Sequence, residues 1–361
     1  MPLLETAVTA QNVVGYFEAT TTQDDSLGAR LFPAEKQLGL TLEYIKGSGN
    51  KAVQLRASAF DTRTTFRDRM PIELNSERMP FFKEGYLVKE SDRQQLAILE
   101  MTGNQALIDT VLTKIFSDSA NLILAAQARV QAMRMQVLAT GKLAIDSNGV
   151  KQEYDYSVPE ENKGTVANNW SDADNATPLK DIAEAVDKMA DNGVAIEGAV
   201  MNNRTFGYLR DAKSTKRQIK GNVQNATPDV TNRELTEFLS NEYGVTLEIV
   251  KATNVGDDGQ AHKIFPDGHV TLIPNQTLGR TVYGTSPAEM DLTSRQDVDV
   301  SVVNTGVAVV TTMTTDPVNK QTRAEMVTLP SFEGANLVYL MTTEAEADEP
   351  IDEGSEAGAS A

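Results

Sequence analysis

One unbroken stretch of helical periodicity, from about residue 104 to residue 141, constrains the fold of this chain more than any other feature. Apolar and small residues recur in it at steps of four and three, the spacing that keeps one face of an α-helix pointing the same way. That face comprises Ile108, Leu112, Ile115, Ser119, Leu122, Ala126, Val130, Met133 and Val137. No proline interrupts the stretch, and Gly141 stands where a helix C-terminus favours glycine. A coiled coil would need a strict seven-residue repeat, which this pattern does not keep. We therefore predict one helix, roughly 55 Å long, that serves as a spine for sheets.

The composition indicates a globular protein. The chain has 361 residues, enough for two or three packed units, and its 40% hydrophobic and 23% charged residues do not suggest wholesale disorder. No apolar run approaches the roughly 18 residues of a membrane helix, and the N-terminus lacks the basic-then-apolar pattern of a signal peptide. The absence of cysteine excludes disulfides, thiol catalysis and cysteine-bound zinc. We expect a protein that is made and assembles in a cytosol.

The net charge is strongly negative and unevenly spread. Its value of −18 argues against a broad nucleic-acid-binding face, because neutralising phosphates needs clustered Lys and Arg. Residues 344–361 hold seven of the acids and no base, so the rest of the chain carries −11. A segment so rich in Glu, Asp, Ala, Gly and Ser buries too little to order itself. We expect an acidic disordered tail over residues 344–361 that adds nothing to the fold.

The first 30 residues are polar, threonine-rich and weakly patterned. Residues 11–17 could form a short turn of helix, but no core-forming pattern surrounds them. Two interpretations remain open: a floppy terminus, or an arm that orders only against a neighbouring subunit.

A β-hairpin with a basic cluster comes next along the chain. Residues 40–45 and 53–59 alternate between apolar and polar side chains, and a glycine-rich turn at residues 47–50 joins them. The turn is not a phosphate-binding loop, because a strand rather than a helix follows it. The basic cluster comprises Lys51, Arg56, Arg63, Arg67 and Arg69, opposed by Asp61 and Asp68. It is either a solvated hairpin face or a projecting loop that docks on an acidic surface of another copy. A strand over residues 79–88 and a helix from Ser91 then lead to the spine.

Beyond the spine, the patterns predict a second, mixed α and β unit. Asn148-Gly149 marks a hairpin turn, and a shift in composition places a domain boundary near residues 157–176. Thr177 before Pro178 predicts a helix start, and a similar cap is expected at Thr227-Pro228 before a second helix. Strands are predicted at residues 245–250, 263–265, 270–273, 298–315 and 337–342. We expect the last strand to rejoin the sheet of the spine, so that the second unit is an insertion.

No residue pattern argues for catalysis. His262 and His269 are the only histidines and could form a metal pair with Asp267, but the spacing places no third ligand. Asp172 and Asp174 resemble part of a calcium loop, without its terminal bidentate Glu. The chain has no Gly-x-Ser-x-Gly elbow, no dinucleotide-binding Gly-x-Gly-x-x-Gly and no HExxH helix. We therefore expect no catalytic residue, no metal site, no cofactor and no enzymatic activity.

Several short motifs point to one protein family. They are Gln136-Val137-Leu138-Ala139-Thr140-Gly141-Lys142-Leu143, Gly149-Val150, Tyr154-Asp155-Tyr156 with Pro159, Trp170-Ser171-Asp172, Gly279-Arg280-Thr281-Val282-Tyr283-Gly284, Leu329-Pro330 and Asn336-Leu337-Val338-Tyr339. Together with the order of arm, hairpin, spine, inserted unit and return strand, they resemble the lambda-type major capsid (head) protein family of tailed bacteriophages. The likeness spans roughly residues 31–343.

The resemblance implies an α+β fold of the Hong Kong 97 type. Its parts would be an N-terminal arm (residues 1–37), an extended E-loop hairpin (38–85), a peripheral domain with the spine helix (86–175 and 296–343) and an axial domain (176–295). Such proteins work through their interfaces, so the resemblance makes the basic cluster of the E-loop a candidate intersubunit contact.

The resemblance also implies a shell protein of the virion, assembled in the cytoplasm of a bacterial host. Copies would form hexamers and pentamers of an icosahedral head around double-stranded DNA, with portal, scaffold and decoration proteins as partners and no membrane. An acidic shell suits this task, because an interior that repels phosphate does not trap the genome. Two alternatives remain open: an encapsulin-like compartment shell that holds a cargo protein, and an α+β hydrolase or binding enzyme with an unrecognised site.

Overall fold

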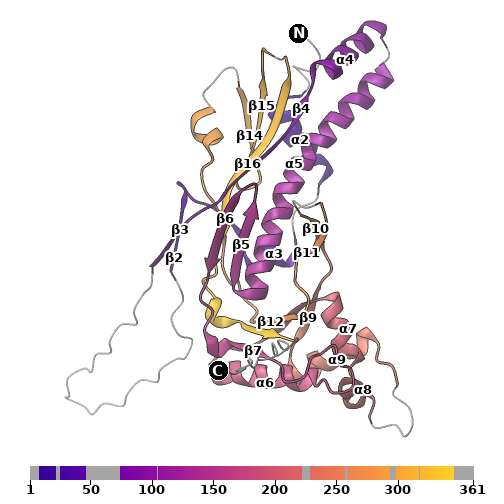
Figure 1. The fold of residues 1–361 in the computed structure, drawn as a ribbon, viewed down its shortest axis with the longest axis vertical. Helices are drawn as coiled ribbons and strands as arrows, with labels where there is room; N and C mark the ends of the chain where they lie inside the picture. Colours follow the sequence, from indigo (N-terminus) through magenta and orange to yellow (C-terminus); the bar gives the residue numbers. More distant parts are fainter. Residues whose placement is uncertain are drawn as a thin grey trace, which may run out of the picture.

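The computed structural model describes residues 8–21, 25–45, 74–103, 105–221, 228–256, 259–292, 298–316 and 318–344. Its longest element is the predicted spine, α5 (Gln105–Thr140), which runs from one end of the molecule to its middle (Figure 1). Every residue of the predicted apolar face is buried or half-buried, which confirms both the helix and its orientation. Gly141 ends the helix with a φ of 69°, and a Cβ there would lie 2.5 Å from Cγ2 of Val158, so both backbone and packing require glycine.

A six-stranded sheet packs against the spine. Its strands are β1 (Ala34–Lys36), β4 (Phe81–Val88), β13 (Thr281–Tyr283), β14 (Val298–Val303), β15 (Val307–Met313) and β16 (Lys320–Pro330). They follow the order β1-β13-β16-β15-β14, and β4 pairs with β16 beside β13. The strands predicted over residues 79–88 and 298–315 are confirmed, the second as the hairpin β14–β15. The central strand β16 is not predicted, because its first half, Lys-Gln-Thr-Arg-Ala-Glu, shows no apolar alternation.

Two helices cover one face of this sheet. In an antiparallel sheet, two residues that are paired across strands point to the same face, and successive residues of one strand point to opposite faces. Followed from β4 through β16 and β15 to β14, this register puts Phe82 and Asp299 on the same face. The Arg129 guanidinium of α5 lies 5.7 Å from the centre of the Phe82 ring. Asp299 accepts a 2.5 Å hydrogen bond from the backbone N–H of Ala10, the first residue of α2 (Ala10–Thr20). This side, with α5 and α2 in contact with each other, is the helix-covered face.

The N-terminal segment belongs to the core of its own subunit. Val13 and Phe17 of α2 are buried, and the Tyr16 ring stacks on Phe116 of α5 with centroids 5.7 Å apart. Over residues 8–21, the predictions of a floppy terminus and of an arm ordered only by a neighbour are therefore both wrong. The partners of α2 include a strand that lies 289 residues away in sequence, which explains why no local pattern announces the contact.

A second sheet lies at the other end of the spine (Figure 1). Its order is β7-β17-β12-β8-β9, from the strands β7 (Lys163–Thr165), β8 (Gly198–Asn202), β9 (Thr246–Val250), β12 (His269–Ile273) and β17 (Tyr339–Thr342). Four helices contribute residues to a separate hydrophobic core, which includes Trp170. They are α6 (Pro178–Asp191), α7 (Asn203–Asp211), α8 (Lys213–Lys220) and α9 (Asn232–Tyr243). The prediction that the last strand rejoins the sheet of the spine is wrong: β17 pairs with β12 and β7, and β16 is the strand that returns.

The remaining elements are mostly short. They are α3 (Leu27–Leu31), α4 (Glu90–Thr102), β2 (Thr41–Ile45), β3 (Leu74–Arg78), β5 (Lys142–Ser147), β6 (Val150–Asp155), β10 (Thr253–Val255), β11 (Ala261–Lys263), η1 (Glu160–Asn162), η2 (Ala288–Leu292) and η3 (Ala335–Leu337). The hairpin predicted around Asn148-Gly149 is confirmed as β5–β6. The second sheet is tied to the spine by the Thr271 hydroxyl, which donates to the Leu138 carbonyl at 2.8 Å.

The two predicted helix caps have different outcomes. Pro178 is the first residue of α6 after Thr177, as predicted, but the Thr177 hydroxyl donates to the Asp181 carboxylate instead of capping the helix backbone. The cap predicted at Thr227-Pro228 is wrong, because α9 starts at Asn232. Thr231 caps it through a reciprocal capping box with Glu234, which satisfies two backbone N–H groups at the start of the helix.

Candidate assembly surfaces

The strands that flank the predicted basic cluster pair with each other. β2 and β3 are antiparallel from Thr41–Arg78 to Ile45–Leu74 and lie at one side of the molecule (Figure 1). The strand predicted at residues 53–59 lies outside the described residues. So do all the cluster residues, Lys51, Arg56, Arg63, Arg67 and Arg69. Their role as intersubunit contacts stays a prediction.

Three tyrosines hold this strand pair against the body. Tyr44 of β2 lies beside Tyr156, with ring centroids 6.4 Å apart. The Tyr156 hydroxyl donates to the Pro330 carbonyl at the end of β16, at 2.5 Å. From β6, the Tyr154 hydroxyl donates to the Arg78 carbonyl of β3 at 2.8 Å. The β2–β3 pair, which is the root of the predicted E-loop, is thereby anchored to the β5–β6 hairpin and to the central strand of the first sheet.

We expect this root to weaken in alkali. Burial, followed by the charges of Glu77 and Glu333, raises the pKa of Tyr44 to about 12, and burial with Glu77 raises the pKa of Tyr154 to about 12. Both lie above the ordinary value near 10, so the stability they contribute is complete below pH ~10 and is lost as the pH rises through about 12. Tyrosinate absorbance recorded together with circular dichroism tests this. Replacing both residues with Phe should reduce the late titration but not abolish it, because burial also raises the pKa of Tyr156. A single tyrosinate step near pH 10 in the parent chain would contradict the assignment.

The other face of the six-stranded sheet exposes apolar side chains. By the strand register, Phe81 and Leu87 of β4 and Val302 of β14 point away from the helices, and they are 46%, 43% and 45% exposed. The turn η2 covers part of this side through Ala288, while its own Met290 is 70% exposed. Phe81, Leu87 and Val302 are the open-face residues. Apolar side chains on an uncovered face are typical of protein–protein contact surfaces.

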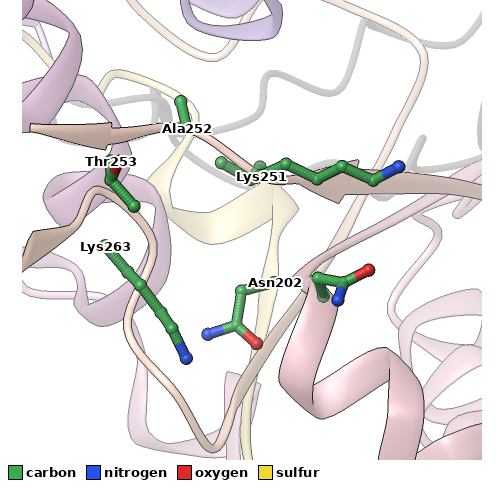
Figure 2. Close-up of a pocket in the computed structure, with 7 residues that line it drawn as sticks. Asn202, Lys251, Ala252, Thr253 and Lys263 are labelled. Carbon is green, nitrogen blue, oxygen red and sulfur yellow. The ribbon is translucent and has the colours of Figure 1, made fainter.

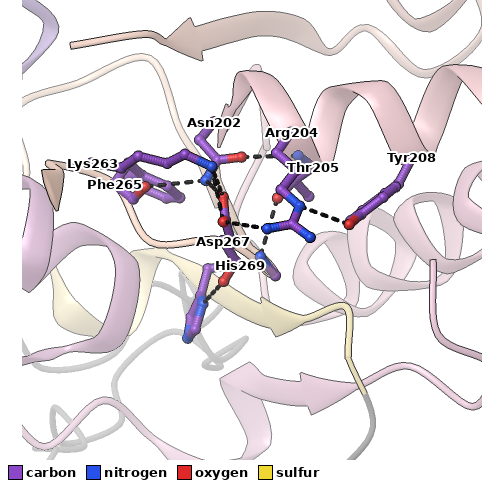
Figure 3. Close-up of polar contacts among 9 residues, drawn as sticks. Asn202, Arg204, Thr205, Tyr208, Lys263, Phe265, Asp267 and His269 are labelled. Atoms are coloured by element: carbon purple, nitrogen blue, oxygen red, sulfur yellow. Dashed lines mark hydrogen bonds and ion pairs between the residues drawn. The ribbon is translucent and has the colours of Figure 1, made fainter. Parts of the chain in front are cut away.

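A polar cluster surrounds Asp267 in the second unit (Figure 3). The carboxylate accepts hydrogen bonds from Lys263 Nζ at 2.6 Å, Asn202 Nδ2 at 2.5 Å and Arg204 Nη1 at 3.2 Å. Burial by itself raises the pKa of Asp267, but the hydrogen bonds from Lys263 and Asn202 outweigh it, so the pKa lies below its ordinary value. His269 Nδ1 lies 2.8 Å from the Asp267 carbonyl oxygen. The histidine thus contacts the backbone of the turn, and the Asp267 carboxylate is engaged by cations.

The acids near the domain boundary serve the local turn. The Asp172 carboxylate accepts from the Asn175 side chain at 2.7 Å and from the Asp174 N–H at 3.1 Å. In the part of the chain that the structure describes, no group of three or more His, Cys, Asp or Glu side chains could hold a metal ion.

A scan against protein-family models matches residues 9–343 to the family described as phage major capsid protein E. The chain belongs to this family. Two solved structures share the fold of this capsid protein. A prophage capsid protein from E. coli CFT073 is 14% identical, with a TM-score of 0.56 over 93% of this chain and 99% of that one. A phage-related protein from Bordetella bronchiseptica RB50 is 12% identical, with a TM-score of 0.53 over 93% and 97%. A search of curated proteins gives no match.

The family and the fold are those of structural proteins, so this capsid protein is a shell component of the virion and not an enzyme. The expectations of an α+β phage-capsid fold and of a self-assembling shell protein are thereby confirmed, and the hydrolase alternative is set aside. The encapsulin-like alternative has less support than the phage shell. Within the described ranges, α5 included, no helix is both long and apolar enough to span a membrane.

The sequence patterns do not predict surfaces that are formed by segments far apart in the chain. The motif Tyr154-Asp155-Tyr156 marked two of the three root tyrosines, but their carbonyl partners lie 76 and 174 residues away. The open-face residues include Phe81 and Leu87, which belong to one predicted strand. The sequence pattern predicts that strand, but it does not show which of the strand's two sides stays exposed.

Proposed function

We propose that copies of this capsid protein assemble as hexamers and pentamers into an icosahedral head that encloses the double-stranded DNA of a tailed phage. The observation that carries the proposal is that the two faces of the first sheet differ in how far they are covered. Helices of the same subunit cover one face, whereas the open-face residues leave apolar surface in water. Removing such surface from water is favourable, and a shell supplies further copies of the chain that can cover it.

In this proposal the fold is divided as the family resemblance implies. Residues 1–37 are the N-terminal arm, 38–85 the E-loop, 86–175 and 296–343 the peripheral domain, and 176–295 the axial domain. Two strands depart from these bounds, because β13 pairs in the first sheet and β17 in the second, and α2 of the arm packs on its own subunit. Portal, scaffold and decoration proteins are its proposed partners. Electron microscopy of negatively stained particles, with nucleic-acid and protein analysis of their content, tests the assignment. Closed shells that hold double-stranded DNA are expected, shells that hold one protein cargo would favour an encapsulin-like compartment, and a lasting monomer would refute both.

The open face can be tested with two neighbouring residues. Leu87→Glu places a charge on the open face and should leave the unfolding temperature of the subunit nearly unchanged, because the side chain is already 43% exposed. It should raise the protein concentration needed for assembly about tenfold, the effect of losing ~1.4 kcal/mol per contact. Light scattering at increasing protein concentration measures this threshold.

Tyr86→Glu is the matched control. Tyr86 is 48% exposed on the same strand but points to the helix-covered face, so its substitution should leave the threshold close to that of the parent. Equal effects of the two substitutions would show that the open face is not the contact surface.

A further inference from the structure

A pocket of about 370 Å³ lies where the second sheet meets the β10–β11 hairpin (Figure 2). Its walls are Asn202 and Asn203 at the junction of β8 and α7, residues 250–253 from the end of β9 to the start of β10, and Lys263 at the end of β11. Thr253 and Lys263 face each other across β10–β11, at the end of the hairpin far from its turn. We name this cavity the lysine pocket, after Lys251 and Lys263.

The lysine pocket is locally cationic in an acidic protein. Lys263 and Arg204 share a single carboxylate, that of Asp267, and their side chains remain 44% and 59% exposed. Lys251 is exposed and forms no ion pair with any of the described residues. Three cations, Lys251, Lys263 and Arg204, therefore outnumber the two nearby carboxylates, those of Asp267 and Glu344, in a chain whose net charge is −18. The chemistry that fits such a pocket is a carboxylate-rich or phosphate-rich ligand.

The chain leaves the second sheet at the same edge as the lysine pocket, with β12 lying between β17 and β8. β17 ends with Thr342 opposite His269, and the Thr343 N–H donates to the Gly268 carbonyl at 2.7 Å. The next residue, Glu344, is so close that a Cβ on Gly268 would lie 3.2 Å from its Cδ. Figure 3 shows this strand, in yellow, running beneath the Asp267 cluster. Glu344 is thus next to the turn whose Asp267 binds Lys263.

The segment beyond Glu344 has the complementary charge. Residues 345–361 contain six acids and no base: Glu346, Asp348, Glu349, Asp352, Glu353 and Glu356. Fully extended, a segment of this length reaches roughly 55 Å, far more than the distance from the end of β17 to the neighbouring turn requires. Because it is tethered, its effective concentration at the pocket is in the millimolar range, which compensates for the weakness of individual exposed ion pairs.

We propose that the acidic C-terminal segment, residues 345–361, occupies the lysine pocket of its own subunit through its carboxylates. The contact is electrostatic, needs no folded structure in the segment and weakens with salt. It gives the acidic segment a role that the shell fold does not supply: it screens Lys251 and Lys263 from other polyanions, the phosphates of nucleic acid among them.

Cross-linking can test this directly, because the chain contains no cysteine. Unassembled full-length subunits carrying Thr253→Cys and Ser355→Cys should form an intramolecular disulfide under mild oxidation. A second pair, Val150→Cys with Ser355→Cys, places the partner on the exposed β6 strand of the first unit as a control. At low salt, the pocket pair should close roughly fivefold faster than the control pair, because the segment spends more of its time at the pocket.

Charge reversal supplies the second arm. Lys251→Glu should remove the rate advantage of the pocket pair, as should high salt. Lys89→Glu, an equal charge change on an exposed residue beyond the end of β4, should preserve it. Equal closure rates for the two cysteine pairs, or a rate advantage that survives Lys251→Glu, would overturn the proposal. Disulfides that form only between subunits would also overturn it, since they would assign the segment to a neighbouring copy.

Discussion

Leu122→Asp is expected to make the subunit insoluble or unable to assemble. Leu122 is 4% exposed in the spine helix and belongs to the core that α5 forms with the first sheet. A carboxylate there would lose its hydration without gaining a partner, at a cost of several kcal/mol. Domains are typically stable by only about 5–15 kcal/mol, so this single change removes a large part of the margin. The soluble fraction after expression, thermal unfolding and microscopy of particles measure the result.

Leu124→Asp is the control for this prediction. It lies two residues along the same helix, but its side chain is 42% exposed. The new charge there stays hydrated, so the soluble yield and the unfolding temperature should remain close to those of the parent chain. Normal heads from Leu122→Asp would mean that the buried face of α5 has been wrongly identified.

Arg63→Glu combined with Arg67→Glu is expected to block or weaken assembly while leaving thermal unfolding of the subunit nearly unchanged. An isolated hairpin is marginally stable in water, so a projecting loop gains order by lying on another surface, and this protein offers acidic ones. Each exposed ion pair contributes only about 0.2–1 kcal/mol. In a closed shell the same contact recurs at every subunit, so small contributions accumulate. Assembly of the parent chain should accordingly respond to salt, which screens exposed charges.

The control for the arginine pair is Lys180→Glu with Arg233→Glu. This double variant makes the same change in net charge at two exposed helical residues whose side chains are 72% and 85% accessible. It should assemble as the parent does. If the Arg63 and Arg67 variant forms normal heads at low and high salt alike, the loop charges are only solvated and the interface assignment fails.

The sequence by itself determined the elements whose deciding contacts are close along the chain. The α5 helix and its buried side follow from residues three and four apart, whose positions on a helix do not depend on any partner. The β5–β6 hairpin follows from Asn148-Gly149, which adopt the positive φ values of 48° and 77° that a tight hairpin turn requires. The family motifs then indicated the shell function, although they did not indicate which surfaces carry it out.

The tertiary structure decided the elements whose partners are remote. The first half of β16 buries Lys320, Thr322 and Glu325, which is tolerable because the strand lies between β4 and β15 and Glu325 accepts a hydrogen bond from the Ala288 N–H. Buried polar groups are stable only where such partners exist, and a local pattern does not name the partners. The same reason explains the helix α2 in the core and the final strand in the second sheet.

The candidate assembly surface is also a feature that only the tertiary structure decides. Alternation along β4 already places Phe81 and Leu87 on one side and Phe82 on the other. Either side could have been the interior on that pattern alone. The Phe82 side became the interior because α5 and α2 pack there, with Asp299 holding the start of α2. Only that long-range packing determines which apolar side chains are left exposed for another subunit.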